Sequence, residues 1–452
     1  FNYDMPTYPN KKFDGWRDLD GNIYSVEEGV TPSDWISRFT TDTIKLYPIW
    51  KDITYLIKYS MDQSQGETCA EESYIVTLGN TYTLAIPEKL GYVFIGWTLD
   101  EIVGESCNLI TDAQGRSLDL WTLSTSQEYT VYPCFVPQSY TVTLMIDEDT
   151  QYDIVTNVVF GQSFLFEYTA DKISDGSLLT KYPVSLFCGW VNIDGQRYAD
   201  DSGAGAKWND AQDTTLFALW PEFINSQAEF DDFLLEEDHL SRAIALKTDI
   251  VITRPLGNRN NPYTGVFIGN SHTVTLNYSV VDGANYDGYV GMVAHNKGTI
   301  KDVKLITNIE IQTCVGYDGD LYLGGVAGIN EGRIISTISD TQSDIIVSVF
   351  VNFTQSSKNA YIGGIAGKNS GVINNLSCEI NTITIELNGQ AYTHSEESIK
   401  AGCLVGIVES GSVASQRSAK YYYDNDVYIL SDYGIVNVDA IATWSATKIK
   451  NN

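Results

Sequence analysis

The chain has few cations and no long apolar run. Its 452 residues include 28 Lys and Arg against 58 Asp and Glu, giving a formal net charge of −30. Nucleic acid and anionic membrane surfaces are disfavoured as partners, because binding to either needs clustered cations. No run of 18 apolar residues occurs, and the first residues lack the basic and apolar regions of a signal peptide. Neither a membrane-spanning helix nor a leader is therefore predicted.

Motifs that carry catalytic or metal chemistry are also scarce. The four histidines (His239, His272, His295 and His394) form no His-Glu-x-x-His motif, and neither a Gly-x-Ser-x-Gly elbow nor a Cys-x-x-Cys pair occurs. His272 begins an apolar strand and is interpreted as a turn residue. We predict no catalytic, cofactor-binding or metal-binding residues. The chain is expected not to be an enzyme.

The seven cysteines are sparse and odd in number. They fit neither a disulfide scaffold nor a zinc site. Cys69 and Cys107 lie in polar stretches of one repeat and could form a bridge. The other five are interpreted as small core residues; they are Cys134, Cys188, Cys314, Cys378 and Cys403.

The first half of the chain contains a threefold repeat. An apolar strand ends in Gly-Trp at Trp16, Trp97 and Trp190, and each copy ends with a closing strand. The closing strands are Leu46–Trp50, Val131–Phe135 and Leu216–Trp220. Alternation of apolar and polar residues predicts half-buried antiparallel strands. The tryptophans are interpreted as core residues; a sugar-stacking role would need them exposed on one face.

Two Asp-Gly pairs follow the Gly-Trp motifs. They stand in Asp18-Leu-Asp20-Gly21 and Asn192-Ile-Asp194-Gly195. The spacing is also that of the start of a calcium loop, but the later acidic ligands are missing. Asp-Gly between apolar strands is typical of a tight hairpin with positive φ at both central residues, so we predict hairpins.

The phrases Gly91-Tyr-Val-Phe-Ile-Gly-Trp97 and Leu46-Tyr-Pro-Ile-Trp50 resemble the Listeria–Bacteroides repeat. This is the β-grasp-like module of internalin B and other bacterial surface proteins. The resemblance implies tandem modules at 1–52, 53–138 and 139–221. Copies one and three depart from the motif, with Lys11-Lys12-Phe13 and Tyr182-Pro-Val-Ser-Leu-Phe187. Copy one lacks its preceding strand, so we expect a longer protein with further chain before Phe1.

The second half, 222–452, is predicted to be a stacked coil capped by a helix. Ser226-Gln-Ala-Glu229 is a capping box leading a short amphipathic helix. Four glycine phrases follow and end at Gly298, Gly332, Gly371 and Gly411. About three short strands per repeat are expected, with inserted loops near 355–359 and 388–394. Asn296, Asn330 and Asn369 share one phrase position and are expected to stack between coils.

The glycine phrases resemble the GLUG motif, which occurs in bacterial adhesins and IgA-directed metallopeptidases. Thr264-Gly-Val-Phe-Ile-Gly-Asn-Ser-His-Thr-Val274 resembles the phrase that precedes such motifs. The resemblance covers about 226–417 and implies a right-handed, pectin-lyase-like parallel β-helix. A phosphate-binding role is disfavoured because strand-like residues, and no Gly-Lys-Ser/Thr, follow the glycines. The acidic groupings Asp147-Glu-Asp149 and Asp318-Gly-Asp320 are interpreted as solvated turns and not as calcium sites.

The whole chain is thus predicted to be all-β: tandem β-grasp-like modules, then a parallel β-helix with a short capping helix. The expected function is that of a non-catalytic extracellular surface protein, either an adhesin or a structural stalk. Its partners would be a protein or glycan on a cell or matrix surface, or further copies of the same assembly, with no cofactor. Two alternatives stay open: a glycan-active β-helix enzyme and a subunit of a self-assembling extracellular fibre.

Overall fold

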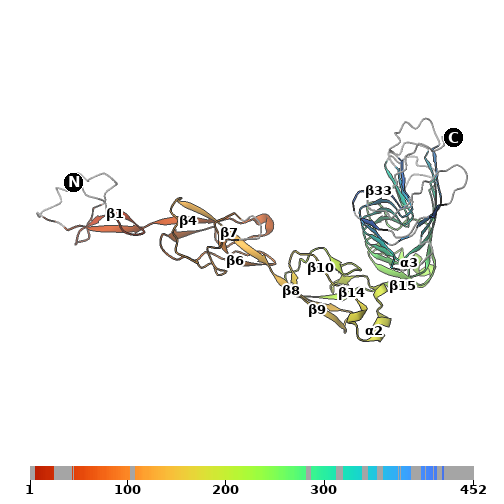
Figure 1. Ribbon diagram of the computed structural model, residues 1–452, viewed down its shortest axis with the longest axis horizontal. Coiled ribbons are helices and arrows are strands. Elements are labelled where there is room, and N and C mark those ends of the chain that lie inside the picture. Colours follow the sequence, from red (N-terminus) through yellow and green to blue (C-terminus); the bar gives the residue numbers. More distant parts are fainter. Residues whose placement is uncertain are drawn as a thin grey trace. The chain divides into compact units, whose positions relative to one another are not determined.

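The computed structural model describes most of the chain. The described residues are 6–24, 43, 45–101, 107–280, 287–311, 319–337, 345–353, 360–374, 376, 378–387, 399–402, 404–410, 412–414 and 420–421. Strands dominate and helices are few and short, which confirms the all-β prediction (Figure 1). No helix in these ranges is long and apolar enough to cross a membrane.

The chain forms two compact units. Unit 1 comprises 1–143, 154–164 and 206–214, and unit 2 comprises 144–153, 165–205 and 215–452. Residues predicted to form the third repeat therefore contribute to both units. The predicted insertions near 355–359 and 388–394 lie outside the described residues.

Unit 1 begins with two sheets in which most neighbouring strands are antiparallel. The first repeat supplies β1 (Lys11–Arg17), β2 (Ile23–Tyr24) and β3 (Tyr47–Asp52) in the order β2-β1-β3. The second supplies β4 (Thr54–Tyr59), β5 (Ser73–Thr77), β6 (Tyr92–Thr98) and β7 (Glu128–Pro137), in the order β5-β4-β7-β6, with a short 3₁₀ helix η1 (Gln63–Gln65). Within the second sheet β4 and β7 are parallel, whereas β5 and β6 pair antiparallel with their neighbours.

The core of the second repeat is built around Trp97. Its ring is fully buried, stacks on Tyr59 with ring centroids 4.7 Å apart, and donates from Nε1 to the Ala85 carbonyl over 2.8 Å. Trp190 of the third repeat is equally buried and donates to the Phe166 carbonyl over 2.6 Å. The core interpretation is confirmed for these two rings, since neither presents a face to solvent, whereas Trp16 of the first repeat is only half-buried.

The structure decides the disulfide question that the sequence left open, and the bridge is not the one between Cys69 and Cys107. Cys107 is bonded to Cys134, with the two Cα atoms 6.4 Å apart, and Cys69 forms no disulfide. Cys134 lies on the buried side of β7, so the apolar residues around it in the sequence give it the pattern of a core residue. The core interpretation holds for Cys188 and Cys378, which are buried. Cys314 and Cys403 lie outside the described residues.

The third repeat contains strands and short helices. Its strands are β8 (Ser139–Met145), β9 (Gln151–Val159), β10 (Phe164–Leu165), β11 (Trp190–Val191), β12 (Arg197–Ala199), β13 (Ala204–Gly205) and β14 (Thr214–Ala218). They form a sheet of order β12-β11-β14-β8-β9 and a pair β10-β13. The helices η2 (Ala170–Lys172), α2 (Gly176–Lys181) and η3 (Val184–Leu186) lie between β10 and β11.

The rest of unit 2 is a stack of chain turns, here called the coil stack, with four parallel sheets. The first contains β15 (Glu222–Ile224), β16 (Ala243–Leu246), β18 (Val266–Ile268), β22 (Thr299–Lys301), β26 (Arg333–Ile335), β30 (Val372–Asn374) and β34 (Ser412–Ala414). The second contains β17 (Ile250–Ile252), β19 (Thr273–Val280), β23 (Lys304–Ile311), β27 (Ile345–Phe353), β31 (Cys378–Leu387) and β35 (Lys420–Tyr421). The third contains β20 (Tyr289–Val290), β24 (Leu321–Gly324), β28 (Ala360–Gly363) and β32 (Ile399–Gly402), and the fourth β21 (Val293–Asn296), β25 (Ala327–Asn330), β29 (Ala366–Asn369) and β33 (Val405–Val408).

Each glycine phrase supplies two strands, so a full repeat has four strands and not three. In the second phrase β24 ends at Gly324 and β25 begins at Ala327, with Gly325 and Val326 at the corner. A Cβ on Gly324 would lie 2.2 Å from the Ala327 carbonyl oxygen, so only glycine allows this approach. Val326 and its equivalents point into one continuous apolar core that runs along the coil stack.

The predicted helix caps the start of the coil stack. Helix α3 (Gln227–Phe233) begins after Ser226, whose side chain accepts from the Glu229 amide, and Figure 1 shows it beside β15 at one end of the stacked strands. Phe230 and Phe233 are buried in the shared core. The Gln227 side chain accepts from the Val251 amide over 2.8 Å and donates to the Val251 carbonyl over 3.1 Å. It thereby replaces a missing neighbour strand for β17.

Candidate functional site

A row of three tyrosines, here called the tyrosine row, lies on the third sheet of the coil stack. Tyr289, Tyr322 and Tyr361 occupy matched positions on β20, β24 and β28, and the register continues to Lys400 on β32. The repeats fix this alignment, because each tyrosine stands two residues before an equivalent glycine: Gly291, Gly324 or Gly363. Parallel strands are about 4.8 Å apart, so equivalent side chains on successive coils come into contact.

The rings of the tyrosine row contact one another from coil to coil. Tyr322 and Tyr361 have centroids 5.1 Å apart and planes 10° apart, and Tyr289 meets Tyr322 edge-on at 5.4 Å. Burial, and then the nearby Asp320 carboxylate, raises the pKa of both Tyr322 and Tyr361. The Tyr322 hydroxyl donates to Asp320 Oδ2 over 3.3 Å. Both phenols therefore stay neutral at physiological pH.

Charged side chains flank the tyrosine row on the fourth sheet. Glu331 lies 3.2 Å from His295 Nε2 and 3.1 Å from Lys297 Nζ, so it links two successive coils. Burial raises the pKa of Glu331, but Lys297 and His295 outweigh it and hold that pKa below its usual range. The His295 ring meets Tyr289 at 6.1 Å.

A second ion pair repeats this arrangement two coils along. Lys368 Nζ lies 2.7 Å from Glu409 and 5.8 Å above the centre of the Tyr322 ring. The tyrosine row thus has a border of alternating charge. Because the Tyr322 and Tyr361 rings stack, the faces by which they meet are covered.

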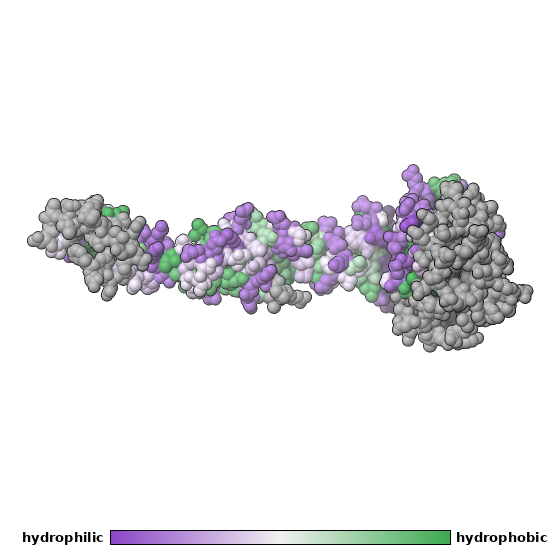
Figure 2. Space-filling view, turned by 90° about the horizontal axis from the view of Figure 1, so that it is seen from above, coloured by the Kyte–Doolittle hydropathy of each residue, from purple (hydrophilic) through white to green (hydrophobic). Residues whose placement is uncertain are grey.

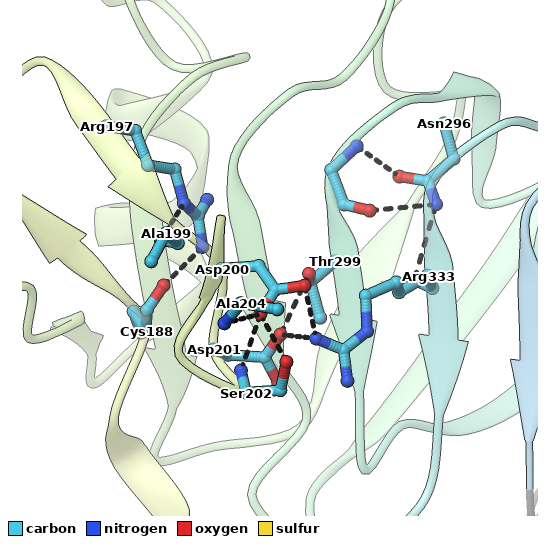
Figure 3. A network of polar contacts seen from close by, with 11 residues as sticks. Cys188, Arg197, Ala199, Asp200, Asp201, Ser202, Ala204, Asn296, Thr299 and Arg333 are labelled. Carbon is cyan, nitrogen blue, oxygen red and sulfur yellow. Dashed lines mark hydrogen bonds and ion pairs between the residues drawn. The ribbon is translucent and has the colours of Figure 1, made fainter. Parts of the chain in front are cut away.

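An acidic pair in the third repeat is occupied by contacts within unit 2. Asp200 and Asp201 both lie 2.8 Å from Nη1 of Arg333 on β26, and Thr299 on β22 donates to Asp201 over 3.2 Å (Figure 3). The Asp201 side chain is only 3% exposed. Burial raises the pKa of Asp200, but hydrogen bonds from Ser202 and the charge of Arg333 outweigh it, and that pKa is lowered. The pair acts as a structural joint.

Apolar contacts extend the same joint. Cys188 packs with Ala245, Val266 and Ile268 on the outer side of the coil stack's first sheet. Arg197 donates to the Cys188 carbonyl and, over 3.2 Å, to that of Ala199, as Figure 3 also shows. This part of the third repeat is therefore fixed to the first coils.

The two Asp-Gly segments form turns, as predicted. Asp18 Oδ1 accepts from the amides of Asp20 and Asn22, and Asn192 Oδ1 accepts from those of Asp194 and Gln196. The hairpin prediction holds, but positive φ is confined to Gly21 and Gly195, because these side-chain bonds close a longer loop.

The other acidic and histidine positions also lie in turns. Asp147 accepts from the Asp149 amide, and hydrogen bonds, first from Thr150, lower its pKa. His272 follows two residues with positive φ, immediately before β19, as expected. His239 is half-buried near Glu236, and His394 and Asp318 lie outside the described residues. Among the described residues no group of three His, Cys, Asp or Glu side chains is arranged to hold a metal ion.

Apolar and polar residues are interspersed on the surface of the repeats. In the described parts of the face in Figure 2, hydrophobic residues lie among hydrophilic ones. The most exposed apolar side chains, Leu235 at 80%, Leu19 at 77% and Ile193 at 77%, lie on turns.

Comparisons with known proteins give little. No protein-family model matches the chain, and no solved structure matches it. A stretch of 130 residues is 28% identical to a protein of Evansella cellulosilytica named "Putative membrane protein". That stretch is 28% of this chain and 18% of the relative, so the chain spans less than a fifth of that protein's length.

Two of these features were missed by sequence reasoning. The tyrosine row had a signal, a tyrosine at one position in three of the four phrases, from which no prediction was drawn. The joint between Arg333 and the acidic pair had none, since its partners are 132 residues apart.

Proposed function

We propose that the chain is part of an extracellular surface protein, an adhesin or structural scaffold without catalysis. Its first half forms β-grasp-like modules of the Listeria–Bacteroides type that serve as a stalk. Its second half forms a right-handed, GLUG-type parallel β-helix, and the tyrosine row is its contact surface for a glycan or protein.

The joints between successive repeats carry this proposal. Only Ile53 separates β3 from β4, and only Gln138 separates β7 from β8. One repeat's closing strand thus leads directly into the next repeat's first strand, leaving no linker long enough to act as a free hinge. Repeats joined in this way would act as a spacer.

A second contact recurs at both joints. Asn10 and Gly91 each stand three residues before the motif phenylalanine and have φ of 59° and 77°. A Cβ on Gly79 would lie 2.0 Å from the Asn10 amide nitrogen, and one on Gly91 would lie 2.4 Å from the Phe160 ring. In each case a turn of the following repeat packs on the residue with positive φ. Recurrence of one contact at two joints supports tandem repeats joined in one manner.

The disulfide supports an extracellular location. Bonds such as Cys107–Cys134 form and persist in oxidising compartments and are rare in the cytosol. The excess of acidic residues is also common in proteins outside the cell.

The test is binding of the full chain to glycan and protein arrays, with a reducing-sugar assay on every glycan retained. Binding that falls at least about tenfold in Tyr322→Ala, which removes one ring of the row, supports the adhesin. Tyr47→Ala, an exposed tyrosine of β3, is the matched control. Release of sugar ends would replace the adhesin with a glycan-active enzyme, and concentration-dependent polymerisation without ligand would replace it with a fibre subunit.

A further inference from the structure

The first and last strands of the second repeat lie side by side and run parallel. The register pairs Leu56 with Glu128 and Tyr59 with Val131. The Leu56 amide donates to the Gln127 carbonyl over 3.1 Å, and the Ser60 amide donates to the Val131 carbonyl over 2.9 Å.

Side chains reinforce this strand pair. Lys58 Nζ lies 2.6 Å from Glu128 Oε2, and the Tyr55 and Tyr129 rings meet edge-on at 5.9 Å. Ile57 and Val131, both fully buried, belong to the repeat's core. Separation of β4 from β7 would therefore break backbone bonds, an ion pair and core packing at once.

The chain enters and leaves the repeat through these two strands. Tension along the chain reaches β4 at its start, through Ile53, and leaves β7 at its end, through Gln138. Because the strands are parallel, the two pulls are opposed along the strand direction and make β4 slide along β7. All bonds between the strands then resist together, whereas pulling a hairpin apart from its ends breaks one bond at a time.

We propose that the second repeat is a mechanical clamp: the paired strands β4 and β7 resist unfolding when the chain is pulled along its length. This function rests on the proposed role of the repeats as a stalk, since only a chain held at both ends is pulled.

The disulfide gives the clamp a second property. Cys107 and Cys134 are 27 residues apart and enclose residues 128–131, the β7 half of the clamp. Once β4 has separated, the enclosed segment still cannot extend. Breaking the disulfide adds about 90 Å to the extension of the unfolded repeat, at about 3.5 Å per residue.

Single-molecule pulling of the full chain by its two ends tests the clamp. The second repeat is recognised as the event whose extension grows by about 90 Å when the disulfide is reduced. Its unfolding force should exceed that measured with handles at residues 53 and 78. Those handles open the β4–β5 hairpin from its end, where Thr54 pairs with Thr77. Equal forces in the two geometries overturn the proposal.

A pair of variants separates the clamp from general stability. Ser60→Pro removes one amide that bonds β7, and Val76→Ala removes buried packing on β5 without touching that bond. At a matched loss of thermal stability, Ser60→Pro should lower the terminal unfolding force more. Equal losses of force overturn the clamp; if Ser60→Pro does not fold, the two pulling geometries decide on the unsubstituted chain. If the chain binds a partner but fails these tests, the clamp is rejected and the stalk function stands. If the tests succeed in a chain that binds nothing, the adhesin role alone is rejected.

Discussion

The side-chain amide of Asn330 donates to the side-chain oxygen of Asn369 over 2.7 Å, and both residues are fully buried. Asn296 donates to Asn330 over the same distance one coil earlier. The same side chains close the turns between sheets, since Asn296 Oδ1 accepts from the Gly298 amide over 3.1 Å. The asparagines therefore hold both the spacing of the coils and the shape of each corner.

Replacement of the central asparagine should destabilise the coil stack strongly. Asn330→Ala leaves Asn296 and Asn369 with unmatched buried groups, and we expect a loss of about 3 kcal/mol in the free energy of unfolding. Asn308→Ala is the matched control, because Asn308 donates to Asn277 between the same kind of coils but is exposed. Its loss should stay within about 0.5 kcal/mol. Urea denaturation measures both; equal losses would show that the buried row is not stabilising.

Removal of the Gln227 side chain should open the edge of the coil stack. In Gln227→Ala the amide and carbonyl of Val251 lose their partners, so β17 becomes an unpaired edge. We expect a loss of about 1 kcal/mol and concentration-dependent self-association, measured by sedimentation velocity. Asp231→Ala removes another contact of the same glutamine and leaves Val251 paired, so it should sediment like the unsubstituted chain. Identical sedimentation of the two variants would contradict an edge-capping role.

Substitution of Arg333 should lower the free energy of unfolding, because it leaves a buried carboxylate without its cation. Arg333→Met leaves Asp201 buried beside Asp200 without a cation, which we expect to cost about 3 kcal/mol. Calorimetry should show the third repeat melting at a lower temperature. Addition of Asp201→Asn to this variant should restore part of the loss. Failure of the second substitution to restore stability would mean that the charge is not the cause.

The same joint predicts acid sensitivity. The pKa of Asp200 lies below its ordinary value of 3.8 in the folded protein, so its stabilisation is fully present above that pH. It is lost as the pH falls through the lower, folded pKa. In Arg333→Met one cause of the lowered pKa is gone, so the drop in melting temperature below about pH 4 should be smaller. Parallel melting curves against pH in both proteins would exclude this contribution.

Loss of the disulfide should destabilise the second repeat alone. The bond closes a loop of 27 residues, and its removal in the Cys107→Ser, Cys134→Ser double variant should cost about 3 kcal/mol. Cys69→Ser is the control, since Cys69 forms no disulfide, and it should leave the melting temperature unchanged. A loss in the control equal to that of the double variant would point to packing instead of the cross-link.

The sequence by itself determined the repeats and their local chemistry. Four sequence features act within a few residues or through strict repetition: the periodic glycines, the asparagine at one phrase position, the capping box at Ser226 and the Gly-Trp motifs. In the structure, the repeated asparagines stack as Asn296, Asn330 and Asn369, the capping box begins helix α3, and the Gly-Trp motifs bury the Trp97 and Trp190 rings. Such features are readable because repeated sequence places equivalent side chains at equivalent positions on neighbouring coils.

Only the tertiary structure decided what meets across long separations. Three such features depend on how whole elements pack. They are the pairing of Cys107 with Cys134 instead of Cys69, the four strands per coil, and the contact of Asp200 and Asp201 with Arg333. Pairing β4 with β7 likewise joins strands separated by most of a repeat. No local pattern encodes these contacts, because each is set by the shape of the surrounding fold rather than by the residues that form it.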